Sequence, residues 1–184
     1  MGIRIFLAVW LSPELHERTA GFIEKLKPGS SGVKWSSKEQ LHLTLKFLGD
    51  QPPALLEKMR PFMERVSQET SPFELIFGEG GVFPPRGEPR VLWVGLKDGI
   101  VPLSNLASAI ENVCGECGVP KEDRPFKAHL TIGRVKSLPA RFDGELLKKG
   151  IEGEMRVEGF AVVESKLRPQ GSSYETLRVY ELNK

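Results

Sequence analysis

The chain has 184 residues, of which 40% are hydrophobic and 27% are charged, the ordinary composition of a soluble globular protein. This length allows one domain with a substantial core, or two small lobes. The formal net charge of +2 is too small to indicate a nucleic-acid partner by itself, and two cysteines are too few for a disulfide framework.

The first predicted element is a buried strand within residues 1–10. This stretch is apolar, but it is too short to span a bilayer and lacks a signal-peptide cleavage pattern. We therefore expect a cytoplasmic protein. Ser12 and Pro13 open an amphipathic helix that runs to about Leu26, because proline is favourable in a first helical turn. A further helix is predicted at about 53–68, after Pro52 and Pro53.

The second half of the chain begins with a segment that is similar to the start of the first half. Residues 90–95 resemble residues 4–9, at an offset of 86, and Pro102 opens a helix through about Cys117. Apolar residues lie on one face of this helix, namely Leu103, Leu106, Ala107, Ile110 and Val113. The remaining predictions are strands at about 73–78, 155–165 and 174–182, a weak helix at 143–149, and a glycine- and proline-rich loop over residues 78–87.

Two of the three histidines lie in matching phrases, His42-Leu43-Thr44-Leu45 and His129-Leu130-Thr131-Ile132. The phrases begin 87 residues apart, close to the offset of the repeated strands, which indicates an internal duplication. Each phrase is typical of a β-strand, so its histidine and threonine share one face while the central leucine points into the core. The pattern predicts an α+β protein, a single domain of two pseudo-symmetric lobes (approximately 1–85 and 86–184). We expect antiparallel sheets around a central cleft and helices on the outside.

Two imidazoles that face one cleft can perform acid–base chemistry near neutral pH. A neutral histidine takes a proton from the nucleophile while a protonated one gives a proton to the leaving oxygen. The hydroxyls of Thr44 and Thr131 can hold phosphate oxygens beside them. This set of groups fits displacement at phosphorus, above all in a strained cyclic phosphodiester. A cluster of basic residues around the second phrase suits an anionic substrate, although it also fits a solvated face: Lys121, Arg124, Lys127, Arg134 and Lys136.

Other chemistries fit the sequence less well. Two histidines without a matched carboxylate or cysteine are too few for a typical zinc site, so no metal or cofactor is expected. Neither phrase has a placed serine or cysteine nucleophile. Cys114 and Cys117 have redox spacing, but they fall near the end of the predicted helix rather than at its start and no second ligand pair exists, so we expect no functional role for them. His16 lies in an amphipathic helix without such a phrase and is interpreted as a surface or packing residue.

At these residues the chain resembles the RNA 2′,3′-cyclic phosphodiesterases of the 2′-5′ RNA ligase family, within the 2H phosphoesterase superfamily. The superfamily is named for two His-x-Thr-x motifs. The resemblance covers essentially the whole chain and rests on these segments: 4–8, 42–49, 81–85, 90–95, 129–134, Glu164-Ser165, Gly171 and Tyr174. It implies a bilobal fold and metal-independent hydrolysis of a terminal 2′,3′-cyclic phosphate on RNA to a 2′-phosphate.

The resemblance also implies roles for individual residues. His129 is then the proton acceptor for water, His42 the proton donor to the ribose O3′, and Thr44 and Thr131 hold the phosphate. Arg134 matches a nucleotide-binding arginine and Phe47 an aromatic near the base. Strict strand alternation puts these last two on the wrong face, unless Gly49 and Gly133 bend the strands. A core position for Phe47, and for Arg134 an exposed positive charge without a role in the site, therefore stay open.

Three hypotheses for the function follow. The first is the cyclic phosphodiesterase, acting as a monomer on RNA ends or small cyclic nucleotides, without a membrane partner. The second uses the same site in the opposite direction, for reversible 2′-5′ joining of tRNA halves. The third is a non-catalytic module that binds RNA ends or nucleotides. Histidine and threonine are intact in both phrases, which argues against the third.

Overall fold

The fold is given by a computed structural model, and the structure describes residues 2–168 and 171–183. Within these residues, four α-helices and one 3-10 turn alternate with strands. The strands are β1 (Ile3–Trp10), β2 (Val33–Trp35), β3 (His42–Gln51), β4 (Phe73–Phe83), β5 (Val91–Asp98), β6 (Leu130–Val135), β7 (Glu154–Val157), β8 (Gly159–Arg168) and β9 (Gly171–Glu181). The helices are α1 (Pro13–Leu26), α2 (Pro53–Glu69), α3 (Ile100–Glu116) and α4 (Gly144–Lys149), and the 3-10 turn is η1 (Lys38–Gln40).

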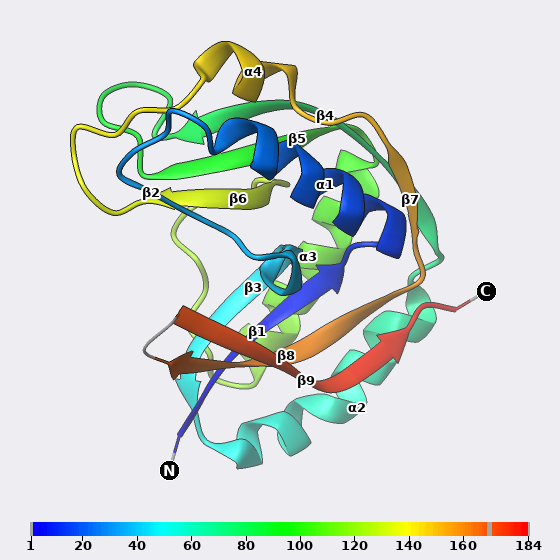
Figure 1. Cartoon of the computed structure of the whole chain (residues 1–184). Coiled ribbons are helices and arrows are strands. Elements are labelled where there is room, and N and C mark those ends of the chain that lie inside the picture. The colour runs from blue at the N-terminus through cyan, green and yellow to red at the C-terminus, as the bar shows by residue number, and fades with distance from the viewer. Residues whose placement is uncertain (1, 169–170, 184) are drawn as a thin grey trace.

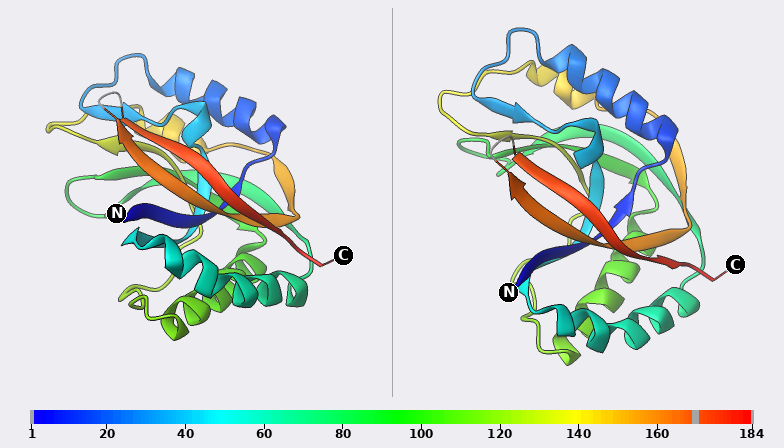
Figure 2. Two further views of the ribbon diagram at one scale, coloured as in Figure 1. Left: turned by 90° about the horizontal axis from the view of Figure 1, so that it is seen from below. Right: turned by 60° about the horizontal axis from the view of Figure 1, so that its bottom comes forward.

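The strands form one strongly curled sheet with the order β7-β4-β5-β6-β3-β1-β8-β9, and β2 pairs with β6 outside this path. The pairings between these strands are antiparallel. Helices α2 and α3 lie together at one end of the molecule, and α1 and α4 lie at the other (Figures 1 and 2). The predicted α+β class with outer helices is confirmed. The two lobes share one continuous sheet, joined where β3 meets β6.

If each half of the chain formed one lobe, each half would supply the strands of one end of the sheet. The observed strands are distributed differently. One end contains β3 and β1 followed by β8 and β9, because the C-terminal strands return to pair with the N-terminal strand. The other end contains β4 to β7. The internal repeat of 1–85 and 86–184 stays a prediction, but the lobes in space do not follow that boundary.

The predicted long helices are confirmed, with one shifted start. Ser12 caps α1, since its Oγ accepts a hydrogen bond from the Leu15 backbone N–H at 3.3 Å. Helix α3 begins at Ile100, two residues before Pro102, after an N-cap glycine at Gly99. Proline fits there because the first-turn N–H groups have no partner within the helix. The predicted apolar face of α3 is buried.

The strand prediction for 155–165 merged two strands. The structure divides this stretch at Glu158, because β7 pairs with β4 at one end of the sheet and β8 pairs with β1 at the other. The predicted helix at 143–149 is confirmed as α4, where the Asp143 carboxylate caps the Leu146 N–H at 2.8 Å.

The predicted loop over residues 78–87 is wrong in its first half, where β4 continues to Phe83. The glycines serve close packing rather than a turn. A Cβ on Gly80 would lie 2.2 Å from the Leu147 carbonyl oxygen, and one on Gly81 would lie 2.6 Å from the Trp93 ring. Glycine therefore lets α4 and Trp93 approach this strand.

We expect Gly80→Ala to destabilise the protein by ~1–3 kcal/mol, because the added Cβ would clash with the main chain of Leu147 rather than with a flexible side chain. Gly21→Ala is the matched control: nothing lies within 4 Å of its Cβ position in helix α1, so alanine should stabilise the helix by ~0.5–1 kcal/mol. Urea unfolding of both variants measures the difference. Equal stability of the two would contradict the packing role of Gly80.

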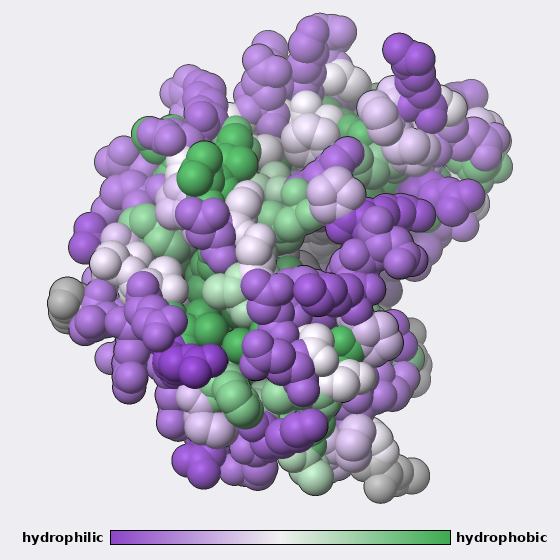
Figure 3. Space-filling model, turned by 180° about the vertical axis from the view of Figure 1, so that it is seen from behind, coloured by the Kyte–Doolittle hydropathy of each residue, from purple (hydrophilic) through white to green (hydrophobic). Residues whose placement is uncertain are grey.

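Within residues 2–168 and 171–183, none of the helices has the length and apolar character needed to cross a membrane. Seen from behind, polar side chains cover most of the surface, and the molecule is hollowed between its two ends (Figure 3).

Candidate active site

The two histidine motifs meet at the centre of the sheet. Leu43 in β3 pairs with Leu130 in β6, and both leucines are buried, at 1% and 0% exposure. Continued one residue either way, this antiparallel register sets His42 opposite Thr131 and Thr44 opposite His129, with Cβ atoms roughly 5 Å apart. The other face of the sheet thus carries a square of two imidazoles and two hydroxyls. Each histidine occupies a corner diagonal to the other.

A backbone carbonyl two residues earlier orients each imidazole. His42 Nδ1 lies 2.7 Å from the Gln40 carbonyl oxygen, and His129 Nδ1 lies 2.7 Å from the Lys127 carbonyl oxygen. A ring nitrogen facing a carbonyl must donate, so in both histidines Nε2 carries the free lone pair. In the first motif Thr44 Oγ1 donates to His42 Nε2 at 3.0 Å. These two carbonyls could not be predicted from the sequence, because every residue has a backbone carbonyl and none of them is marked by its side chain.

The two motifs differ in their aromatic surroundings. The centroids of the Phe6, Tyr174 and Trp10 rings lie 4.7, 5.3 and 5.7 Å from the His42 ring. The Phe83 ring lies edge-on to His129 at 5.1 Å. Spacing along the chain gives no signal for Phe6 or Trp10, which reach the site because β1 pairs with β3.

These surroundings lower the pKa of both imidazoles. Burial is the main cause for His42, whose pKa falls to about 4, and the charges of Arg134 and His129 lower it further. Burial and the Arg134 charge also lower the pKa of His129, against the opposing effect of the Lys127 carbonyl. Both histidines are therefore neutral in the free protein at pH 7.

Because the pKa of His42 is lowered, we expect the protein to lose stability in mild acid. Between pH 6.5 and about 4 the unfolded chain binds a proton at His42 that the folded chain does not. The free energy of unfolding should fall through this window by on the order of 3 kcal/mol and stay unaffected above it. His42→Gln should lack this part of the pH dependence. Urea unfolding of both proteins from pH 7.5 to 4.5 checks it, and parallel curves would contradict it.

Arg134 and Phe47 reach the cleft because each strand contains a β-bulge directly after its threonine. Thr44 pairs with Ala8 and Lys46 with Leu7, which leaves Leu45 as an extra residue. In β6, Thr131 pairs with Trp93 and Gly133 with Leu92, which leaves Ile132 as the extra residue. A bulge shifts the alternation by one residue. The core alternative for Phe47 is therefore wrong: its side chain is 41% exposed, with the Arg4 guanidinium 4.9 Å above the ring.

Two cavities adjoin at Thr44 and Phe47, one beside each histidine. The cavity on the His42 side has a volume of about 200 Å³, and its walls include Trp35, Thr131, Arg134, Lys136 and Tyr174. The cavity on the His129 side has a volume of about 890 Å³, and its walls include Phe83, Arg90, Arg124, Phe126 and Lys127. Four residues of the predicted basic cluster thus line the cleft. The fifth, Lys121, lies outside these walls and bonds Asn112 Oδ1 at 3.4 Å.

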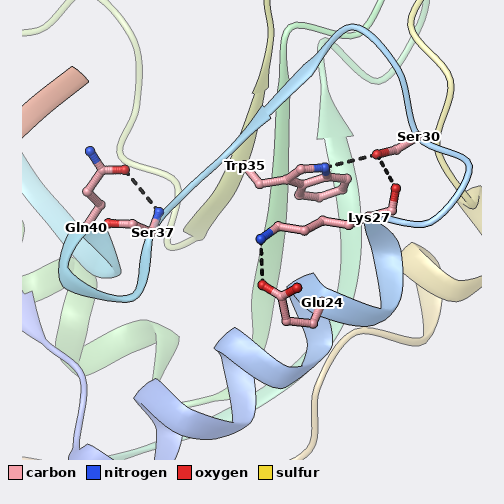
Figure 4. Close-up of polar contacts among 6 residues, drawn as sticks. All are labelled: Glu24, Lys27, Ser30, Trp35, Ser37 and Gln40. Atoms are coloured by element: carbon pink, nitrogen blue, oxygen red, sulfur yellow. Dashed lines mark hydrogen bonds and ion pairs between the residues drawn. The ribbon is translucent and has the colours of Figure 1, made fainter. Parts of the chain in front are cut away.

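Side-chain contacts brace the segment that leads into the first motif. Trp35 Nε1 donates to Ser30 Oγ at 3.1 Å, and Ser30 Oγ donates to the Lys27 carbonyl at 2.7 Å (Figure 4). The Ser37 N–H donates to Gln40 Oε1 at 3.1 Å (Figure 4). Gln40 Nε2 donates to the Ser172 carbonyl at 2.6 Å. Gln40, whose carbonyl orients His42, is therefore fixed through its side chain both to its own turn and to strand β9.

Residues outside the cleft show no comparable arrangement in the described part of the chain. There, no three His, Cys, Asp or Glu side chains gather as metal ligands would. Cys114 and Cys117 are buried and free, and burial raises the pKa of the Cys114 thiol to about 12. His16 lies in α1 with its Nε2 buried and unpaired.

Comparison with known proteins places the chain in a family. Residues 13–168 match the model of the 2′-5′ RNA ligase superfamily, and the chain belongs to that superfamily. It is 38% identical over 182 residues to the RNA 2′,3′-cyclic phosphodiesterase of Archaeoglobus fulgidus, with 97% of this chain and 100% of that protein covered. The protein of the same name from Thermus thermophilus is 35% identical over 184 residues, with 98% and 90% covered.

Solved structures share the fold. The crystal structure of TT0787 of Thermus thermophilus superimposes with a TM-score of 0.87 at 31% identity, covering 98% of each chain. The E. coli LigT structure complexed with 3′-AMP gives a TM-score of 0.85 over 100% of both chains. At 24% identity the second likeness concerns the fold alone. The family resemblance noted in the sequence is confirmed.

Proposed function

We propose that this chain hydrolyses a terminal 2′,3′-cyclic phosphate on RNA to a 2′-phosphate, without a metal ion. The observation that carries the proposal is the square of His42, Thr44, His129 and Thr131 on one face of the paired strands β3 and β6. Near-full-length relatives named RNA 2′,3′-cyclic phosphodiesterase support the choice of substrate.

In the proposed reaction, His129 Nε2 takes a proton from water as the water oxygen attacks phosphorus. His42 gives a proton to O3′ as the P–O3′ bond breaks, which leaves the phosphate on O2′. Thr44, Thr131 and Arg134 bind the non-bridging oxygens, where negative charge grows in the transition state. Phe47 contacts the nucleoside. The lowered pKa of His42 requires that the anionic phosphate supply the charge that raises it again when substrate binds.

The pH dependence of the rate follows from this scheme. One histidine must be protonated and the other neutral, so the profile should be bell-shaped. In the free protein the pKa values of both histidines lie below 6.5, so the alkaline limb of kcat/KM should have an apparent pKa below 6.5. The bound phosphate raises the histidine pKa, so kcat should fall at a higher pH. Initial rates from pH 4.5 to 9 test this, and identical alkaline limbs for kcat and kcat/KM would contradict it.

The direct test is incubation with a nucleoside 2′,3′-cyclic phosphate in EDTA, with the position of the product phosphate determined by chromatography. The proposal predicts a 2′-phosphate and full activity in EDTA. A 3′-phosphate product would overturn the acid–base assignment. Tight binding of 2′-phosphate ends without turnover of any cyclic substrate would favour a non-catalytic binding module instead.

A second candidate activity is reversible 2′-5′ joining of RNA ends, such as tRNA halves. The observation that favours it is the volume of about 890 Å³ beside His129, far more than a water nucleophile needs. Its walls contain the Phe83 and Phe126 rings and the cations Arg90, Arg124 and Lys127, which suit a nucleoside whose 5′-hydroxyl replaces water. Accumulation of ligated over hydrolysed product, with a 5′-hydroxyl RNA present, would establish this activity.

We further propose that the protein acts in the cytoplasm as a monomer. Its two buried free thiols fit a reducing compartment. Light scattering at working concentration tests the monomer, and a dimer mass would overturn it.

A further inference from the structure

Lys46 is a buried lysine that the proposed mechanism does not use. It follows Thr44 by two residues, and strict alternation would place it in the cleft. The bulge at Leu45 turns it to the buried side, where its side chain is 1% exposed. Lysine is rarely buried unless it is partnered, and here Nζ lies 2.7 Å from Glu111 Oε2 of helix α3.

Both members of this ion pair also bind the main chain of one segment. Lys46 Nζ donates to the Pro120 carbonyl oxygen at 3.1 Å. Glu111 Oε1 accepts from the Glu122 N–H at 2.7 Å. The segment 119–129 leads from α3 to β6 without helix or strand (Figure 1), so these contacts supply the support that a regular element would otherwise provide.

The same segment builds the site on its other side. Arg124, Phe126 and Lys127 form one wall of the larger cavity. The Lys127 carbonyl accepts the Nδ1–H of His129 at 2.7 Å and thereby orients the ring. The contacts thus tie strand β3, which carries His42, to the segment whose Lys127 carbonyl orients His129. In β6 the residue equivalent to Lys46 is Gly133, so this brace serves the second histidine alone.

We propose that Lys46 and Glu111 are a positioning pair, which holds the segment 119–129 so that the Lys127 carbonyl aims His129 Nε2 into the cleft. The inference rests on the proposed function for its kinetic readout only. Without the pair the folded protein keeps its sheet, but His129 loses a fixed carbonyl partner and samples other orientations. A displacement of about 1 Å at a reacting group can lower a rate up to ~100-fold.

The test is the double variant K46M/E111L, which replaces the ion pair by apolar side chains. Replacing a buried pair in this way is often neutral or stabilising. We expect an unchanged urea midpoint, kcat lowered ~10- to 100-fold on a nucleoside 2′,3′-cyclic phosphate, and an altered kcat/KM pH profile. A stable double variant with wild-type kcat and pH profile would overturn the proposal.

The matched control is K58M. Lys58 Nζ also donates to a carbonyl near this segment, that of Cys117 at 3.1 Å, but there the end of helix α3 already holds the chain. We expect K58M to keep wild-type kcat. An equal loss in K58M would assign the effect to general loosening and overturn the specific role of the pair.

A readout without turnover separates this inference from the proposed function. NMR titration of the His129 ring should give a different pKa in the double variant than in the wild type, whether or not the protein hydrolyses any substrate. An unchanged His129 titration would overturn the pair's role. Should the double variant not fold, K46M alone removes the buried charge, leaves Glu111 partly exposed at 23%, and gives the same readouts.

Discussion

Replacing either His42 or His129 by alanine is expected to lower kcat/KM on a nucleoside 2′,3′-cyclic phosphate by ~10²- to 10⁴-fold. Each imidazole has one proton-transfer task, and among the described residues that line the two cavities no third histidine could take it over. Steady-state rates of the two variants measure the effect. Near-normal activity in both would end the acid–base scheme.

His16→Ala is the control for this pair of variants. It also removes a histidine, but His16 lies in α1 and lines neither cavity, so its kcat/KM should stay at the wild-type value. Urea unfolding at pH 7.5 shows that each variant is folded. The two active-site variants should also differ from each other: His42→Ala removes a ring that contacts three aromatic side chains, so we expect it to cost more stability than His129→Ala.

The second large effect is expected at the threonines. Thr44→Val and Thr131→Val keep the shape of the side chain and remove the hydroxyl that the scheme places on a phosphate oxygen. Loss of one such donor typically lowers kcat by ~10²- to 10³-fold, because the hydrogen bond strengthens as charge grows in the transition state. We expect kcat to fall more than KM rises. An effect on KM alone would mean that the threonines bind the ground state only.

Thr19→Val is the matched control for these substitutions. Thr19 is fully buried in α1, and its Oγ1 has no hydrogen-bond partner among the described residues. Removing that hydroxyl should leave kcat unchanged and keep or raise stability, since an unpaired buried polar group is unfavourable. The same threonine-to-valine substitution therefore distinguishes a hydroxyl that takes part in catalysis from one that is only buried.

Much of the site could be predicted because it depends on local geometry. A strand of period two places His42 and Thr44 on one face and Leu43 on the other, whatever the strand pairs with. Helix α1 follows from Ser12, Pro13 and an apolar face in the same way. The family resemblance rests on the same phrases and adds the substrate that spacing could not name.

Features that depend on strands far apart in the sequence were decided only by the tertiary structure. The bulges after Thr44 and Thr131 arise from pairing with β1 and β5, and they carry Phe47 and Arg134 into the cleft while they bury Lys46. The glycines of β4 are typical of a loop in the sequence, and only the packing of α4 and Trp93 against them explains their place in a strand.

The two near-identical motifs also acquire different chemistry only in the fold. The sequence by itself determined that each carries an imidazole and a hydroxyl on one strand face, because side-chain alternation is a property of the local backbone. The fold decided that three aromatic rings surround His42 and one contacts His129, so burial lowers the pKa of His42 to about 4. Desolvation depends on which distant residues exclude water from a group, and no local pattern records that.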